Sequence, residues 1–201
     1  MTRIVFLPGL GADARQWAPQ RAAFPDSVVP PWIPPRPAES LRQFAARMAV
    51  HAEVLVGSSF GGMVALEMAH VVRPRLVLLI GSATAAPPLS RWLALLAPLA
   101  RWLPDAGVLT LFGPHARGSR ELAAAMLRDA DRRFIAWGLG AIARWSEEAP
   151  IDVPTRRLHG ARDRLIPAGD ADEIVAGAGH LVNLTHPTEV NRWIARQLRE
   201  V

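Results

Sequence analysis

The chain has 201 residues, enough to bury one hydrophobic core without covalent cross-links, and it contains no cysteine. The composition therefore excludes disulfides and thiolate chemistry, and it favours a cytoplasmic protein. All 23 basic residues are arginines, and with 18 acidic residues they give a formal net charge of +5 that is spread along the chain. Without a basic run or a nucleic-acid-binding motif, this charge predicts no nucleic-acid partner.

Short, unbroken apolar runs recur along the chain and are typical of strands buried on both faces of a parallel sheet. They occur at residues 3–9 (RIVFLPG), 54–57 (VLVG) and 75–82 (RLVLLIGS), and a more polar run follows at 153–160 (VPTRRLHG). Helical patterns stand between them. This order predicts an α/β fold, a mostly parallel open sheet of about six strands with helices on both faces. Ligands of such sheets bind beyond the carboxyl ends of the strands.

Two predicted helix starts have the spacing of a capping box, in which the first side chain and a glutamine three residues later bind each other's backbone. They are Asp13 with Gln16, and Ser40 with Gln43. The last helix is predicted to begin near Pro187. The helix that opens at Ser40 carries an apolar stripe of Leu41, Phe44, Ala45 and Met48. The last helix carries a stripe of Val190, Trp193, Ile194 and Leu198, and we expect it to pack on the sheet.

From about residue 85 to residue 149 the pattern changes to helices only. We interpret residues 85–149 as a helical cap inserted within a single domain of residues 1–201, over the carboxyl edge of the sheet. Ordinary core helices are the alternative. Pro98 and Arg101 interrupt the apolar stretch at 92–103 (WLALLAPLARWL), so we expect no stable membrane insertion. A lipase-like lid that docks on an interface is a further interpretation of this stretch.

The segment Gly57-Ser58-Ser59-Phe60-Gly61 matches the pattern G-x-S-x-G, and it lies between a strand pattern and a helix pattern. In such a turn the central serine has strained backbone angles. The glycines two residues before and after it avoid clashes with the neighbouring strand and helix. The spacing selects Ser59 rather than Ser58 as a nucleophile.

The first predicted strand ends in residues 7–11 (LPGLG), a turn able to bring the backbone amide of Leu10 beside that of Phe60. Two such N–H groups would form an oxyanion hole, which stabilises the tetrahedral intermediate of acyl transfer. A phosphate-binding loop is the alternative for this glycine-rich turn. The fuller phosphate motifs, including a following lysine, are missing, which favours the oxyanion hole.

An acid and a histidine follow the last two predicted strands. Asp163 comes after residues 158–160 (LHG), and His180 comes after residues 174–179 (IVAGAG). A serine is a poor nucleophile until an imidazole takes its proton, and the imidazolium needs a carboxylate to orient and stabilise it. Asp170 and Asp172 are the competing acids. Structural or surface positions explain four other histidines, His51, His70, His159 and His186.

Four segments carry a resemblance to a known family: residues 9–17 (GLGADARQW), 57–69 (GSSFGGMVALEMA), 134–145 (FIAWGLGAIARW) and 159–167 (HGARDRLIP). Through them the sequence resembles the α/β-hydrolase superfamily over essentially its whole length, with a reduced N-terminal part. The order serine, acid, histidine is the order of that superfamily's triad. The resemblance implies that Ser59 is the nucleophile, Asp163 the acid and His180 the base. It also implies that Leu10 and Phe60 are the two oxyanion donors, and it implies neither a cofactor nor a metal ion.

Three features depart from that family. Ser58 stands before the nucleophile, where relatives often carry histidine or an aromatic residue, and the usual His-Gly of the oxyanion loop is Pro8-Gly9. Only sixteen residues separate Asp163 from His180, where the superfamily commonly places a full helix. A parallel crossover normally needs a dozen or more residues, so we expect a connection that is nearly a bare turn.

We expect a serine hydrolase that cleaves a small carboxylic ester through an acyl-enzyme. A thioesterase or acyl-carrier esterase would use the same triad, as would a lyase or a cofactor-free haloperoxidase. A non-catalytic binding member of the fold is the alternative from another class. The sequence assigns no oligomeric state. We expect the substrate pocket between the sheet and the cap, with apolar walls. The residues expected to line it are Ser58, Trp92, Leu96, Trp137 and Trp145.

Overall fold

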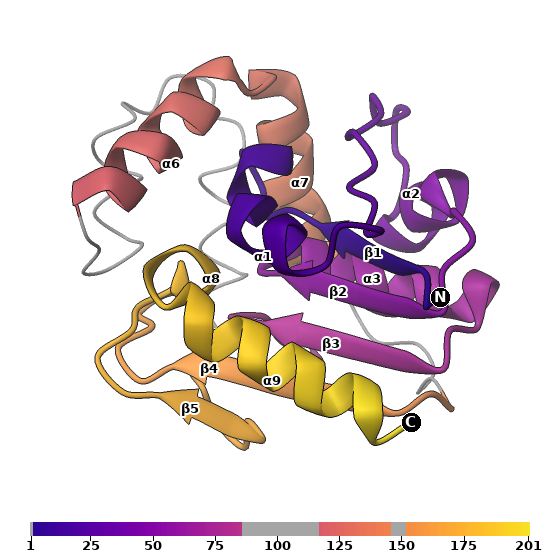
Figure 1. The fold of residues 1–201 in the computed structure, drawn as a ribbon. Helices are drawn as coiled ribbons and strands as arrows, with labels where there is room; N and C mark the ends of the chain where they lie inside the picture. Colours follow the sequence, from indigo (N-terminus) through magenta and orange to yellow (C-terminus); the bar gives the residue numbers. More distant parts are fainter. Residues whose placement is uncertain (1, 86–116, 146–151) are drawn as a thin grey trace.

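The structure is a computed structural model, and it describes residues 2–85, 117–145 and 152–201 (Figure 1). In that part of the chain five strands form one sheet, all of them parallel and in sequence order. The predicted α/β class and parallel sheet are therefore confirmed. The strands are β1 (Ile4–Leu7), β2 (Val54–Ser58), β3 (Leu76–Ile80), β4 (Thr155–Gly160) and β5 (Glu173–Val175).

Helices connect and cover these strands. The long helix α3 follows β2 directly, and α9 closes the chain and begins at Pro187, as predicted. The helical elements are η1 (Ala14–Trp17), α1 (Ala18–Ala23), α2 (Leu41–Met48), α3 (Phe60–Val72), α6 (Arg117–Asp129), α7 (Arg132–Arg144), α8 (Val182–Thr185) and α9 (Pro187–Arg199).

Strands β1, β2 and β3 each contribute side chains to two hydrophobic cores, because neighbouring positions of a strand point to opposite faces of the sheet. On one face Leu7 and Leu55 belong to the core that α2 and α3 complete. On the other face Phe6 packs with Trp17 and Trp193, which η1 and α9 supply. Figure 1 shows α9 and α3 on opposite sides of the sheet. Strands β1, β2 and β3 are thus buried on both faces, which leaves the ends of the strands as the place for functional residues.

The two predicted capping boxes have different outcomes. Ser40 and Gln43 form one: the Gln43 amide donates to Ser40 Oγ at 3.2 Å, and the Ser40 amide donates to Gln43 Oε1 at 3.0 Å. The prediction for Asp13 and Gln16 is wrong. Asp13 caps the short helix η1 by accepting from the amide of Arg15 at 2.9 Å, and the side chain of Gln16 is turned toward other partners.

Helices α6 and α7 come from the segment predicted as a cap, and they contact the loop that follows β1. A Cβ atom placed on Gly138 of α7 would collide with the side chain of Leu10, and one placed on Gly11 would lie 3.0 Å from Leu127 of α6. Trp92, Leu96 and the apolar stretch 92–103 lie outside the described residues. Among the helices that are described, none combines the length and apolarity needed to cross a bilayer.

Candidate active site

Ser59 lies at the sharp turn between β2 and α3. Its backbone has φ 52° and ψ −121°, a left-handed conformation that a side chain with a Cβ atom rarely adopts. A Cβ atom on Gly57 would overlap the backbone of the first turn of α3, and one on Gly61 would overlap the carbonyl oxygens of Leu7 and Pro8. The two glycines thus have the close contacts expected of the G-x-S-x-G turn.

Ser59, His180 and Asp163 lie in one hydrogen-bonded chain. Ser59 Oγ is 2.9 Å from His180 Nε2, and His180 Nδ1 is 2.8 Å from Asp163 Oδ2. The second carboxylate oxygen of Asp163 accepts from the amides of Leu165 and Ile166 at 2.9 and 3.1 Å. These two amides fix the plane of the carboxylate, so its other oxygen faces the imidazole.

The charge of Asp163 is set by opposing effects. Its side chain is fully buried, which alone would raise the pKa of the carboxyl group. The hydrogen bond and charge of His180, with the two backbone amides, outweigh this burial and lower the pKa below its usual value. An ionised Asp163 accepts a hydrogen bond from Nδ1–H of the imidazole. His180 Nε2 then carries a lone pair, to which Ser59 can donate its hydroxyl proton.

The backbone amides of Leu10 and Phe60 have no acceptor within the described residues. Phe60 is the first residue of α3, where a helix has no internal partner for its N–H group. The Gly9 amide is occupied, since it donates to Gln16 Oε1 at 2.7 Å. Gly9 also lies against Ser59: a Cβ atom on Gly9 would be 3.7 Å from that of the serine.

A second buried imidazole supports this arrangement, although the sequence predicted only a structural role for it. His159 Nε2 donates to the carbonyl oxygen of Ser82 at 2.7 Å, and Ser82 Oγ donates to the carbonyl oxygen of Ser59 at 2.6 Å. His159 Nδ1 has no hydrogen-bond partner and lies 3.9 Å from Asp163 Oδ2. Burial lowers the pKa of His159, so its ring is neutral near pH 7.

The competing acids lie elsewhere. Asp170 binds the guanidinium group of Arg157, and Asp172 accepts from the Arg157 backbone amide at 2.7 Å. Both hold the polar start of β4 in place. Three further histidines of the described residues have other surroundings: His51 is exposed, His70 contacts Arg42, and His186 is the residue before α9 and contacts Thr185.

The predicted pocket residues do not form one wall. Ser58 is buried and accepts from the side-chain amide of Gln16 at 3.0 Å. Trp137 packs edge-on against Phe60 with 6.2 Å between ring centroids, beside the nucleophile turn. Trp145 is buried away from these residues, and its indole N–H donates to the carboxylate of Glu67 at 2.7 Å.

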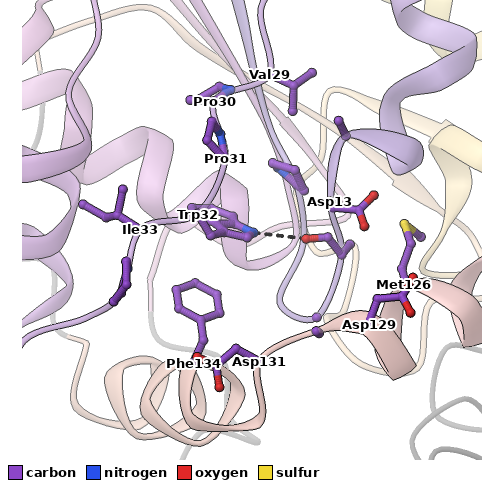
Figure 2. Close-up of a pocket in the computed structure, with 16 residues that line it drawn as sticks. Asp13, Val29, Pro30, Pro31, Trp32, Ile33, Met126, Asp129, Asp131 and Phe134 are labelled. Carbon is purple, nitrogen blue, oxygen red and sulfur yellow. Dashed lines mark hydrogen bonds between the residues drawn. The ribbon is translucent and has the colours of Figure 1, made fainter.

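A pocket of about 380 Å³ lies between the loop after β1, the proline-rich segment and the junction of α6 with α7 (Figure 2). Trp32 forms much of its wall. It stacks on Phe134 at 5.4 Å, and its indole N–H donates to the carbonyl oxygen of Ala12 at 3.2 Å. Sequence reasoning missed this tryptophan, although its place within the proline cluster at 30–37 was a usable signal. The lining is mainly apolar, with Pro8, Gly11, Pro30, Pro31, Ile33 and Met126, and with Asp13, Asp129 and Asp131 at its polar side.

The groups at this site that could act as metal ligands are the imidazole of His180, the hydroxyl of Ser59 and the carboxylate of Asp163. They already form hydrogen bonds with one another. In the part of the chain that the structure describes, no three histidine, aspartate or glutamate side chains come together as metal ligands. The arrangement of hydroxyl, imidazole and carboxylate has the chemistry to activate a hydroxyl group and to hold its proton on the imidazole.

The sequence profile of the alpha/beta hydrolase family matches residues 4–193, so the chain belongs to this family. Family membership supports a hydrolase activity. A search of curated proteins finds no match. Among solved structures the chain resembles a hydrolase from Pseudomonas aeruginosa PA01, with 20% identity, 98% of this chain and 89% of that chain covered, and a TM-score of 0.80.

Two other solved structures share the fold. The thermophilic esterase from Thermogutta terrifontis is 20% identical, with 100% and 90% of the two chains covered and a TM-score of 0.77. The enol-lactonase from Burkholderia xenovorans LB400 is 22% identical, with 98% and 91% covered and a TM-score of 0.77. At these identities the likeness establishes the α/β-hydrolase fold and leaves the substrate to be argued from the site.

Proposed function

We propose that this protein is a serine hydrolase that cleaves a small carboxylic ester through an acyl-enzyme. The observation that carries the proposal is the unbroken chain of contacts from Ser59 Oγ through His180 to the buried carboxylate of Asp163. The Leu10 and Phe60 amides, which have no acceptor among the described residues, support it as the oxyanion donors. Esterases and a lactonase among the structural relatives are consistent with this chemistry.

In the acylation step Ser59 Oγ attacks the carbonyl carbon of the ester while His180 Nε2 takes the hydroxyl proton. The carbonyl oxygen becomes an oxyanion that accepts from the Leu10 and Phe60 amides. Asp163 stabilises the imidazolium. The intermediate then collapses: the bond to the alkoxy group breaks, the alcohol leaves with the proton from His180, and the acyl group stays on Ser59.

In the deacylation step His180 acts as a base again. It takes a proton from a water molecule, which attacks the acyl carbonyl and forms a second tetrahedral intermediate at the same two amides. The bond to Ser59 Oγ breaks, the proton returns to the serine, and a carboxylic acid leaves. Each amide of an oxyanion hole typically contributes about 2.7–4 kcal/mol to transition-state stabilisation.

We assign the apolar part of the substrate to the pocket beside Trp32. Its volume of about 380 Å³ suits a compact ligand, and its lining residues Pro8 and Gly11 flank the proposed oxyanion donor Leu10. The pocket also touches the junction of α6 and α7. This contact supports the proposal that residues 85–149 form a cap over the site within a single domain.

Ester hydrolysis by the wild type and by Ser59→Ala tests the function. A panel of p-nitrophenyl esters of graded acyl length is compared with a matching thioester. Ser27→Ala serves as a control at a buried serine whose hydroxyl donates to the Phe24 carbonyl oxygen. We expect turnover in the wild type and in Ser27→Ala, and loss in Ser59→Ala. Full hydrolysis by Ser59→Ala would overturn the mechanism. Absence of turnover in all proteins would favour a non-catalytic binding protein, and preference for the thioester would favour a thioesterase.

A further inference from the structure

Gln16 connects three segments that the proposed function uses. Its side-chain Oε1 accepts from the amide of Gly9 at 2.7 Å, and its Nε2 donates to Ser58 Oγ at 3.0 Å. Its backbone carbonyl oxygen accepts from the side chain of Asn183 at 2.9 Å. Gly9 precedes Leu10, Ser58 precedes Ser59, and Asn183 follows His180 by three residues. The glutamine itself is 1% exposed.

The orientation of the Gln16 amide is determined by its partners. A backbone N–H can only donate, so the atom that faces Gly9 is the carbonyl oxygen. The NH₂ group therefore faces Ser58, whose hydroxyl accepts from it. The Gly9 amide is engaged in this way, whereas the next amide along the loop, that of Leu10, has no acceptor among the described residues.

We propose that Gln16 is a positioning residue that sets the separation of the two oxyanion donors. One end of its amide group holds the loop that carries Leu10, and the other end holds the turn that carries Phe60. This inference rests on the proposed function. The bridge acts on the N–H groups that bind the oxyanion, so it affects the transition state far more than the bound ester. A misplacement of about 1 Å in such a site can lower a rate by about 100-fold.

Gln20 offers a matched comparison on the next helical turn. Its side chain is 0% exposed, and its Nε2 donates to the backbone carbonyl oxygen of Asn183 at 3.1 Å. Among the residues described, the side chain of Gln20 makes no hydrogen bond to the loop at Gly9 or to the turn at Ser58. A general loss of core packing or of buried hydrogen bonds would appear equally at both glutamines. A loss of oxyanion positioning would appear only at Gln16.

The test compares Gln16→Met with Gln20→Met, since methionine keeps the length of glutamine and removes its amide. With a p-nitrophenyl ester we expect Gln16→Met to lower kcat by about 10- to 100-fold and to change KM by less than about threefold. Gln20→Met is expected to change both constants by less than about threefold. Equal losses of kcat in the two variants would overturn the proposal, because they would indicate a structural role only.

Amide hydrogen exchange gives a second readout that needs no turnover. Loss of the Gln16 acceptor frees the Gly9 amide, so residues 9–12 should exchange faster in Gln16→Met and at the wild-type rate in Gln20→Met. Unchanged exchange in Gln16→Met would overturn the bridge. If the wild type shows no hydrolysis that depends on Ser59, the proposed function fails, and the exchange result alone decides whether Gln16 holds this loop.

Discussion

His180 Nδ1 lies 2.8 Å from Asp163 Oδ2, although the strands that precede these residues are joined by a connection without a helix. Residues 161–172 contain only turns, bends and irregular backbone, and they still bring β5 parallel to β4. Asp163 and His180 follow the carboxyl ends of these neighbouring strands. The short crossover therefore keeps the acid and the imidazole in contact at one edge of the sheet.

Asp163→Asn should lower kcat for ester hydrolysis by about 10³- to 10⁴-fold, because an amide can stabilise the wrong tautomer of the imidazole and cannot stabilise its charged form. KM should change little. Asp170→Asn is the matched control, since Asp170 is exposed and pairs with Arg157. Steady-state kinetics of the two variants decide the point, and similar losses in both would contradict the role of Asp163.

His159 should make the protein less stable as the pH falls below about 6.5, the ordinary pKa of histidine. The pKa of His159 is lowered by burial in the folded protein, so below that pH the unfolded chain binds a proton that the folded chain does not. The free energy of unfolding then falls by up to about 1.4 kcal/mol per pH unit, until the pH reaches the lowered pKa.

His159→Gln removes this titration and leaves a side-chain amide that can donate to the Ser82 carbonyl oxygen. Urea unfolding at pH 7.5 and at pH 5.5 should show a smaller loss of stability in the variant than in the wild type. His51→Gln, at an exposed site, should follow the wild type. If the free energy of unfolding falls equally in His159→Gln and in the wild type between pH 7.5 and pH 5.5, burial of His159 does not cause the loss of stability.

Ala130→Trp should narrow the substrate range. Ala130 lines the pocket beside Trp32, at the junction of α6 and α7, and an indole there would occupy the space assigned to the apolar part of the ester. We expect kcat/KM to fall by about 10-fold or more for longer acyl or aryl esters and to change little for the acetate.

The matched control for Ala130→Trp is Ala23→Trp, which fills a separate hollow near the end of α1. Its chain-length profile should equal that of the wild type. If Ala130→Trp has the same chain-length profile as the wild type, the pocket beside Trp32 does not bind the apolar part of the ester.

Glu67→Leu should lower the free energy of unfolding by about 2 kcal/mol, because it leaves two buried or half-buried donors without their acceptor. Glu67 accepts from the indole of Trp145 at 2.7 Å and from the guanidinium group of Arg42 at 2.8 Å. Glu53→Leu is the comparison at a solvent-accessible ion pair, that of Glu53 with Arg75. There we expect the free energy of unfolding to fall by less than about 1 kcal/mol. Chemical denaturation measures both, and equal losses would contradict the importance of burial at Glu67.

The sequence predicted the parallel sheet because its first three strands are continuous apolar runs, and it predicted the serine turn because glycines on both sides of Ser59 leave room for close contacts with the neighbouring strand and helix. Asp163 and His180 could be placed because residues after neighbouring parallel strands meet at one edge. Their catalytic roles stay predictions. The partners of side chains that point away from a regular face were harder to foresee.

Gln16 shows why. Its spacing from Asp13 fits a capping box, yet its amide binds Gly9 and Ser58, and Ser58 is 42 residues away in the chain. A local pattern contains no information about such a partner. The same holds for Trp145: a helical stripe predicts that its ring is buried, and only the tertiary structure shows that it faces Glu67.

The central claim is tested most directly by labelling the active protein with a fluorophosphonate and locating the label by peptide mass mapping, with His180→Ala as the control. We predict one label per chain, on Ser59, with loss of hydrolysis in step with labelling, and slow labelling of the control. Hydrolysis that persists in fully labelled protein, or a label on another residue of active protein, would contradict the mechanism.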